Sequence, residues 1–369
     1  MGKDIDKNSD NKNEMANQPA IKRRTLLKAL VGIPVLGLFA IELFRKYTYD
    51  QEKKNRVIKE LGLENLKAPV TMKSSSSKSD LLRIGLIGFG TRAVSHANGL
   101  GFMHPNDVES GKKNDSLKDW LAQEDLNVAI TGICDVFDMH AENGLATARN
   151  EFRAGGAAPS KLPVKRYSHY QEMLEDKDID AVMIATPDHH HAPITSAAAK
   201  AGKHVYCEKS PAHSEEQLYE MYDAVKNSKI VYQLGHQITQ SVIFQQARDI
   251  IKKDILGKIT LVETTTNRNT SDGAWIRHLD KNGNPKPGDE KSIDWPQWLG
   301  HAPKVPFSTD RYYNWTKFFD YDIGLIGQLF THEFDSVNQL LRIGIPKSVV
   351  SSGGIYYWKD NRDMPDVLN

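Results

Sequence analysis

The chain has 369 residues, of which 48 are basic and 47 acidic, so its formal net charge is +1. This length suits two domains of ordinary size, each with its own buried core. The balanced charge provides no general attraction for a polyanion, and no long basic run interleaved with aromatic residues occurs, so a nucleic-acid partner is not expected.

The N-terminal region is predicted to carry an export signal. Residues 1–22 form a polar tail with little apolar content. Arg23 and Arg24 then precede a short apolar stretch from Ala29 to Ile41, which is the pattern of a twin-arginine (Tat) signal. An ordinary single-span anchor is the alternative, although Glu42 interrupts a stretch already short for a bilayer.

The signal would lead the protein out of the cytoplasm. Residues 23–44 show no small-x-small cleavage site, so the segment is expected to remain as a membrane tether on a periplasmic or otherwise extracytoplasmic protein. Residues 45–80 are predicted to be a spacer, because they include the Ser- and Lys-rich run from Lys73 to Ser79. Folded structure is expected to begin near Leu81.

A dinucleotide-binding turn follows the first predicted strand. The apolar, β-branched run Leu82–Ile87 passes directly into a Gly-x-Gly-x-x-Ala motif. Gly88 would form the tight turn, Gly90 would let the backbone approach a pyrophosphate, and the small Ala93 would let the next helix close on the strand. The pyrophosphate would sit on free N–H groups at the start of that helix. The cofactor-binding residues predicted in this turn are Gly88, Gly90, Thr91, Arg92 and Ala93.

A carboxylate ends the second predicted strand. Val128–Cys134 is followed by Asp135, the place where an acidic residue accepts hydrogen bonds from the adenosine ribose hydroxyls. The polar insertion from Gly101 to Asp125 makes the spacing longer than usual. Because a carboxylate there repels a 2′-phosphate, NAD is predicted in preference to NADP.

Strands continue to alternate with helices. Strands are predicted at Asp180–Thr186, His204–Cys207 and Ile230–Leu234, with helical segments between them. This alternation indicates a parallel, doubly wound sheet and an α/β fold. Cys134 and Cys207 each end an apolar run, so both are predicted to be small buried residues rather than a disulfide, a redox pair or a metal site.

Together these motifs resemble the glucose-fructose oxidoreductase, inositol dehydrogenase and MocA (Gfo/Idh/MocA) family. The resemblance is carried by Ile84–Ala93, Ala185–His191, Ala201–Lys209, Leu256–Ile259, Asp294–Gly300 and Phe319–Asp335. It implies an NAD(P)-binding Rossmann domain over residues 81–236 and a substrate-binding α+β domain over residues 237–369. The second domain would hold an open, mainly antiparallel sheet and would form homo-oligomer contacts. Because the family's substrate domains are longer, this one is expected to be incomplete.

The resemblance also implies residues beside the nicotinamide. The lysine of the family's Glu-Lys-Pro signature matches Lys209, and here Ser210 separates it from the proline. The cofactor-binding residues implied in this part of the chain are Thr186, Pro187, His191, Glu208 and Lys209. The run of three histidines from His189 to His191 suggests a metal, but adjacent side chains point in different directions and no second ligand cluster has metal spacing, so no metal site is predicted.

A second catalytic element of the family resembles Asp-x-Gly-x-His-x-x-Asp. His332 and Asp335 match it, whereas Gln328 stands in place of the first aspartate. Residues 328 and 332 are one helical turn apart, so they can face one pocket. A glutamine can hydrogen-bond a sugar hydroxyl but cannot take a proton. The predicted catalytic residues are therefore Lys209, His332 and Gln328, with proton transfer left to Lys209 and His332.

Aromatic residues are candidates for stacking on a sugar ring. They are Trp275, Trp295, Trp298, Tyr312, Tyr313 and Trp315. Trp295 and Trp298 lie in a compact turn and are expected in a core instead.

Three functions follow from these features. The first is an NAD(P)-dependent oxidoreductase that moves a hydride between a sugar or polyol and a tightly bound nicotinamide cofactor. The second is an NAD-dependent glycoside hydrolase that uses transient oxidation, as some relatives of the family do. The third is a non-catalytic, NAD-containing sugar-binding protein, which Gln328 favours.

Overall fold

The computed structural model describes residues 81–237, 241–254, 256–267, 270–278 and 288–369, together with helical residues at 48, 51, 52, 55, 56 and 59. The chain divides into two compact units, residues 1–68 and 69–369. The predicted tail and the twin-arginine segment at 23–44 lie outside the described residues, as does most of the spacer. Among the residues that are described, no helix has both the length and the apolar content needed to cross a membrane.

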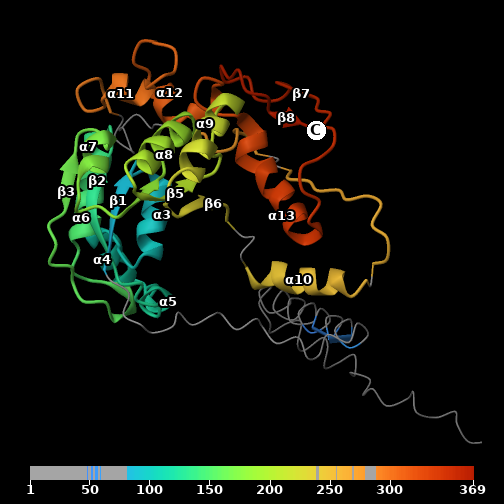
Figure 1. Ribbon diagram of the computed structural model, residues 1–369, viewed down its shortest axis with the longest axis horizontal. Coiled ribbons are helices and arrows are strands. Elements are labelled where there is room, and N and C mark those ends of the chain that lie inside the picture. The colour runs from blue at the N-terminus through green and yellow to red at the C-terminus, as the bar shows by residue number, and fades with distance from the viewer. Residues whose placement is uncertain are drawn as a thin grey trace, which may run out of the picture. The chain divides into compact units, whose positions relative to one another are not determined.

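A six-stranded parallel sheet organises the second unit (Figure 1). Its strands are β1 Leu82–Ile87, β2 Val128–Cys134, β3 Lys165–Tyr167, β4 Ala181–Ile184, β5 His204–Glu208 and β6 Tyr232–Gly235. They run in the order β3-β2-β1-β4-β5-β6, and every neighbouring pair is parallel. This is the doubly wound Rossmann order, in which ligands bind beyond the carboxyl ends of the strands where the order reverses at β1 and β4. The predicted fold class is confirmed.

Helices connect these strands with the signals seen in the sequence. They are α3 Thr91–Gly99, α4 Pro105–Lys113, α5 Lys118–Leu121, α6 Asp138–Arg149, α7 Tyr170–Glu175, α8 His191–Lys200 and α9 Glu215–Lys226. Ser214 caps α9 by accepting a hydrogen bond from the backbone N–H of Gln217. Gly202, with a φ of +73°, follows the end of α8.

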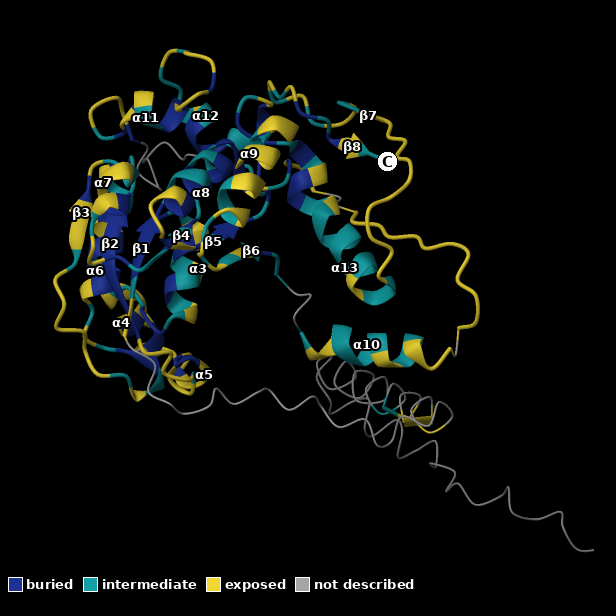
Figure 2. Ribbon diagram, viewed as in Figure 1, coloured by how far each residue is buried: buried dark blue, intermediate teal, exposed yellow. Residues whose placement is uncertain are grey.

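Apolar side chains cover both faces of the sheet, as a buried parallel sheet requires. On one face Leu86 and Ile130 pack with Ala97 of α3, whereas on the other Val182 and Cys207 pack with α8. Figure 2 shows the dark-blue, buried residues concentrated in the strands. Cys134 and Cys207 are free and buried in this core, so their predicted structural role is confirmed.

The later region contributes helices and a small antiparallel sheet. Its elements are α10 Val242–Lys252, α11 Trp295–Leu299, α12 Thr309–Tyr313, a π-helical turn at Ile326–Phe330, α13 Thr331–Leu341, and strands β7 Gly353–Gly354 and β8 Val367–Leu368. The two strands pair antiparallel. The residues that flank β7 are largely exposed.

Part of the later region packs against the Rossmann sheet at the end of β2. Phe137, just after β2, shares an apolar cluster with Ile293, Trp298 and Tyr321. The backbone N–H of Asp294 donates to the carbonyl of Val136 at 2.8 Å. Residues far apart in the sequence are thereby held over the carboxyl edge of the sheet, where the candidate site lies.

Candidate functional site

A cavity of about 1560 Å³ opens at the carboxyl edge of the sheet. It collects the predicted cofactor-binding and catalytic residues into one place. Those that line it are Gly88, Gly90, Thr91, Arg92, Asp135, Thr186, Pro187, His191, Glu208, Lys209, Gln328 and His332. Ala93 does not line the cavity and is buried between α3 and the sheet, which matches its predicted packing role.

The glycine turn has the shape that a pyrophosphate needs. Gly88 has a φ of +80°, and a Cβ there would lie 2.9 Å from the carbonyl oxygen of Ala185. A Cβ on Gly90 would meet no atom within 4 Å. Gly90 is the N-cap of α3, whose first turn carries no acidic residue and no side-chain cap. The first N–H groups of α3 therefore face a space that suits an anion.

Asp135 supports this turn as well as facing the cavity. Its carboxylate accepts hydrogen bonds from the backbone N–H groups of Phe89, within the turn, and Phe137. Burial raises the pKa of Asp135, whereas the nearby His140, 3.8 Å away, and the two N–H donors act in the opposite direction. The open glycine turn, the bare helix start and this carboxylate together fit NAD.

Lys209 enters the cavity at the end of β5. Its Nζ donates to the Oε1 of Gln328 at 2.7 Å. Burial lowers the pKa of Lys209, while the charges of Asp188 and Glu208 raise it. The peptide bond between Lys209 and Ser210 is cis.

Gln328 joins Lys209 to two buried aspartates. Its Nε2 donates to Asp188 at 3.0 Å and to Asp322 at 2.8 Å. Burial raises the pKa of Asp188 to about 6. Burial and the negative charge of Asp188 raise the pKa of Asp322 to about 8. Near neutral pH the pair thus retains roughly one proton.

The amide of Gln328 is consequently oriented by three partners. Both of its N–H groups are used by carboxylates, and its oxygen faces the lysine. For a substrate hydroxyl it offers only the remaining lone pair of Oε1. Through the other it holds the Nζ of Lys209. Sequence reasoning gave no role to Asp188 and did not single out Asp322, because no motif spacing brings these two residues together.

His332 lies in the first turn of α13 and lines the same cavity as Gln328, as their spacing predicted. Its Nδ1 is buried and has no hydrogen-bond partner among the described residues. Burial, the charge of Lys209 and His236 all lower the pKa of His332. The imidazole is therefore neutral near pH 7 and able to accept a proton.

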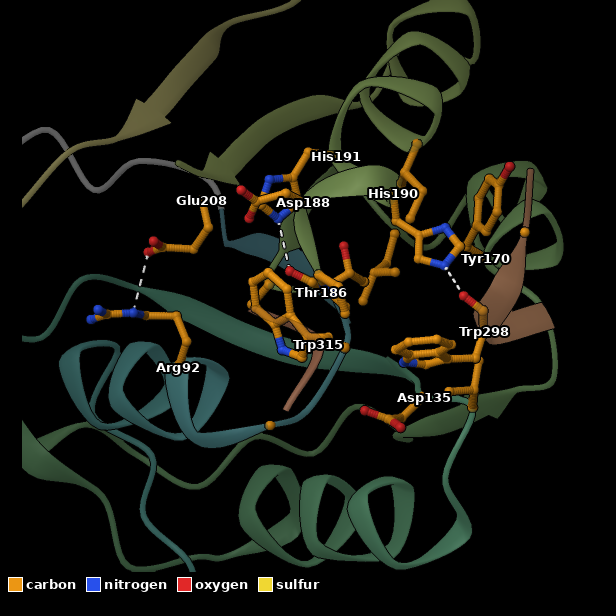
Figure 3. Close-up of a pocket in the computed structure, with 18 of the residues that line it drawn as sticks. Arg92, Asp135, Tyr170, Thr186, Asp188, His190, His191, Glu208, Trp298 and Trp315 are labelled. Atoms are coloured by element: carbon orange, nitrogen blue, oxygen red, sulfur yellow. Dashed lines mark hydrogen bonds and ion pairs between the residues drawn. The ribbon is translucent and has the colours of Figure 1, made fainter. Parts of the chain in front are cut away.

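Glu208 and Arg92 line the cavity but pair with each other. Arg92 Nε lies 3.7 Å from Glu208, which also accepts from His96 at 2.8 Å. Figure 3 shows the Arg92 side chain directed at Glu208. These two predicted cofactor-binding residues connect α3 to the end of β5.

The three adjacent histidines hold loops in place. The Nε2 atoms of His189 and His190 lie 3.0 Å and 2.7 Å from the carbonyl oxygen of Trp298. The ring of His191 lies between the carbonyls of Thr186 and Ser210, connecting the loop after β4 to the lysine loop. Figure 3 shows His191 beside Thr186. Within the described ranges, no group of three or more His, Cys, Asp or Glu side chains could hold a metal ion.

Aromatic side chains cover part of the cavity. Trp295 and Trp298 stack on each other with 4.6 Å between ring centroids, and both are buried, as predicted. Trp298 nevertheless also contributes to the cavity wall. The other aromatic candidates line the cavity too: Trp275, Tyr312, Tyr313 and Trp315.

The sheet order and the glycine turn define an NAD-binding Rossmann protein. Residues 82–236 match the model of the GFO_IDH_MocA family, described as an oxidoreductase family with an NAD-binding Rossmann fold. The resemblance inferred from the motifs is therefore supported for this part of the chain.

Curated relatives and a solved structure are similar to the chain over part of its length. The chain is 32% identical over 187 residues to levoglucosan dehydrogenase of Pseudarthrobacter phenanthrenivorans, covering 51% of this chain and 42% of that protein. It is 30% identical over 149 residues to glycosyl hydrolase family 109 protein 2 of Shewanella sp., covering 40% and 27%. The fold is similar to that of the WlbA dehydrogenase of Chromobacterium violaceum, with a TM-score of 0.50 and 18% identity over 79% of this chain and 63% of that one. The chain spans less than half the length of the two curated relatives.

Proposed function

We propose that this chain is an NAD-dependent oxidoreductase that acts on a hydroxyl group of a sugar or polyol. The observation that carries the proposal is the arrangement of Lys209 and His332 in the same cavity as the glycine turn. The similarity to levoglucosan dehydrogenase supports a sugar-like substrate. The exposed ring of Trp275 and the half-buried ring of Trp315 on the cavity wall suit the apolar face of such a substrate.

The chain's own groups divide the remaining work between them. Bound NAD would accept a hydride from the carbon that carries the reacting hydroxyl. Lys209, held by Gln328, would donate a hydrogen bond to the substrate oxygen. His332 would accept the hydroxyl proton, because its lowered pKa keeps the ring neutral.

The test is turnover by the purified full chain. The protein would be loaded with NAD and mixed with a panel of anhydrosugars, hexoses, uronic acids and cyclic polyols, while NADH absorbance is followed. Oxidation of one substrate class supports the proposal. No NADH formation with any of them, despite bound NAD, would contradict it and leave the hydrolase and the non-catalytic sugar-binding protein as the candidates.

A glycoside hydrolase is the second candidate, and the similarity to a glycosyl hydrolase family 109 protein favours it. In that mechanism oxidation is transient, so the cofactor is regenerated within each cycle. Aryl glycosides would distinguish the two functions. Release of the aryl group without accumulation of NADH identifies a hydrolase, whereas NADH accumulation without release identifies a dehydrogenase.

The pH dependence should report the base. Because His332 must be neutral to accept a proton and its pKa is lowered, kcat/KM for oxidation should stay high below pH 6.5 and fall only at more acidic pH. His332→Gln should remove this acidic limb and reduce kcat/KM by about 10²–10⁴-fold. A profile recorded from pH 4.5 to 9 would check this, and an unchanged acidic limb in the variant would assign it to another group.

Cofactor choice should depend on Asp135. Asp135→Ser is expected to weaken NAD binding, because the turn loses the carboxylate that accepts from the N–H of Phe89. It should also reduce the preference for NAD over NADP by about tenfold or more, because the negative charge that repels the 2′-phosphate is lost. Titration with both cofactors would measure the ratio. Asp138→Ser is the matched control, because this exposed carboxylate pairs with Arg166 instead. Equal affinities of the wild type for NAD and NADP would contradict the prediction.

We also propose Tat-dependent export, which rests on the sequence pattern alone. Replacing Arg23 and Arg24 by lysine should retain the charge but abolish recognition of the pair. The variant is then expected to accumulate in the cytoplasm, as measured by fractionation and immunoblotting. Lys22→Arg with both arginines intact is the control. Unchanged extracytoplasmic protein in the double variant would refute the proposal.

A further inference from the structure

Arg277 is a cation from outside the Rossmann domain that reaches the glycine turn. Its Nη2 donates to the Oγ1 of Thr91 at 2.8 Å, although 186 positions separate the two residues. Thr91 is the first residue of α3, directly after Gly90. Both Thr91 and Arg277 line the cavity. A positive charge therefore stands at the helix start that faces the phosphate space.

The backbone at Arg277 is held by a buried asparagine. The N–H of Arg277 donates to the Oδ1 of Asn314 at 2.7 Å. Asn314 in turn donates to Asp310 at 2.7 Å and is itself buried. This anchoring places the guanidinium at the glycine turn through contacts that do not depend on the Rossmann domain.

The two arginines at this end of the cavity differ in their partners. Arg92 pairs with Glu208, as Figure 3 shows. Arg277, by contrast, forms no ion pair with a carboxylate in the described part of the chain, and its side chain is exposed to the cavity. A guanidinium has five N–H donors in a planar fork, and Thr91 uses one of them. The others suit two oxygens of a phosphate group.

We propose that Arg277 binds the pyrophosphate of NAD and closes the phosphate site from the later region of the chain. Thr91 would orient the guanidinium over the N-terminus of α3, where backbone N–H groups bind the same anion from the other side. The 2′-phosphate of NADP is another anion that an arginine can bind. The pyrophosphate is favoured because Arg277 contacts the start of α3 rather than Asp135 at the ribose.

Replacing Arg277 is expected to weaken the binding of ligands that carry a diphosphate and to leave the binding of the nucleoside alone unchanged. Cofactor would be removed from the full chain, and the affinities for NAD, NADP, ADP and adenosine would be measured by calorimetry. Arg277→Ala should weaken NAD and ADP by about 10–100-fold, the range for hydrogen bonds to charged groups, and change adenosine by less than about twofold. The affinities of Arg277→Lys should lie between those of the wild type and Arg277→Ala, because lysine keeps the positive charge but lacks the planar set of N–H donors of a guanidinium.

Several controls make the outcome decisive. Arg248→Ala on α10 removes an arginine that does not line the cavity and should leave all four affinities unchanged. Arg277→Gln keeps a donor for Thr91 without the charge and should weaken NAD as alanine does. Added salt should lower the affinity of the wild type for ADP more than that of Arg277→Ala.

Three results would overturn the proposal. They are an unchanged affinity for ADP, an equal loss for adenosine, which would indicate a disturbed pocket, and a loss confined to NADP, which would place the guanidinium at the 2′-phosphate. All three are binding measurements on the cofactor site, so they hold whether the chain is a dehydrogenase or a glycosidase.

Discussion

Replacing Lys209 by methionine should lower kcat by about 10²–10⁴-fold while leaving NAD bound. The cofactor is held by the glycine turn and the start of α3, whereas Lys209 lies at the end of β5 with its Nζ on Gln328. Methionine retains the length and apolar character of the stem. The loss should therefore fall on substrate placement and proton transfer rather than on cofactor binding. Single-turnover kinetics would measure the chemical step, and calorimetry would measure the affinity for NAD.

The same variant should also change the buried aspartates. Burial raises the pKa of Asp188, and the positive charge of Lys209 partly offsets this effect by lowering it. Without that charge, Asp188 should retain its proton to higher pH. Lys253→Met, an exposed change after α10, is the control and should keep full activity. A kcat within about tenfold of the wild type in Lys209→Met would exclude this lysine from the chemistry.

Much of the Rossmann domain could be predicted because its signals are local. The β-branched run ending at Ile87, the glycines at 88 and 90 and the capping box at Ser214 each depend on a few neighbouring residues. Parallel strands then bring their carboxyl ends to one edge, so the placement of Asp135 and Lys209 in one cavity follows from topology. Asp135 and Lys209 could therefore be identified as site residues without knowledge of the tertiary contacts.

The rest of the site depends on contacts that local patterns do not specify. Gln328 lies 140 positions from Asp188, and Arg277 lies 186 from Thr91. Nothing in the sequence indicates that Glu208 faces α3 instead of the cofactor, because the direction of a side chain at a strand end depends on its partners there. The sequence also does not show that a carboxylate in place of Gln328 would stand beside two buried aspartates, where a further buried negative charge is unfavourable.

Two glycine variants should separate the binding of the cofactor from the folding of its site. Gly90→Ala is expected to weaken NAD by about tenfold or more, because the added methyl group enters the space through which the backbone approaches the pyrophosphate. Its effect on the unliganded fold should be small. Gly90 has a φ of −80°, which alanine adopts readily, and no atom lies within 4 Å of the new Cβ.

Gly88→Ala should instead destabilise the protein itself. Its φ of +80° disfavours any side chain, and the methyl group would lie 2.9 Å from the carbonyl oxygen of Ala185. Such strain typically costs about 1–3 kcal/mol, which should lower the melting temperature of the cofactor-free protein by several degrees. Thermal unfolding with and without NAD would show the contrast: Gly90→Ala should melt like the wild type without NAD and gain less from its addition, whereas Gly88→Ala should melt lower in both conditions. If Gly90→Ala bound NAD as tightly as the wild type, the pyrophosphate would not pass over this glycine, and the cofactor would have to lie elsewhere in the cavity.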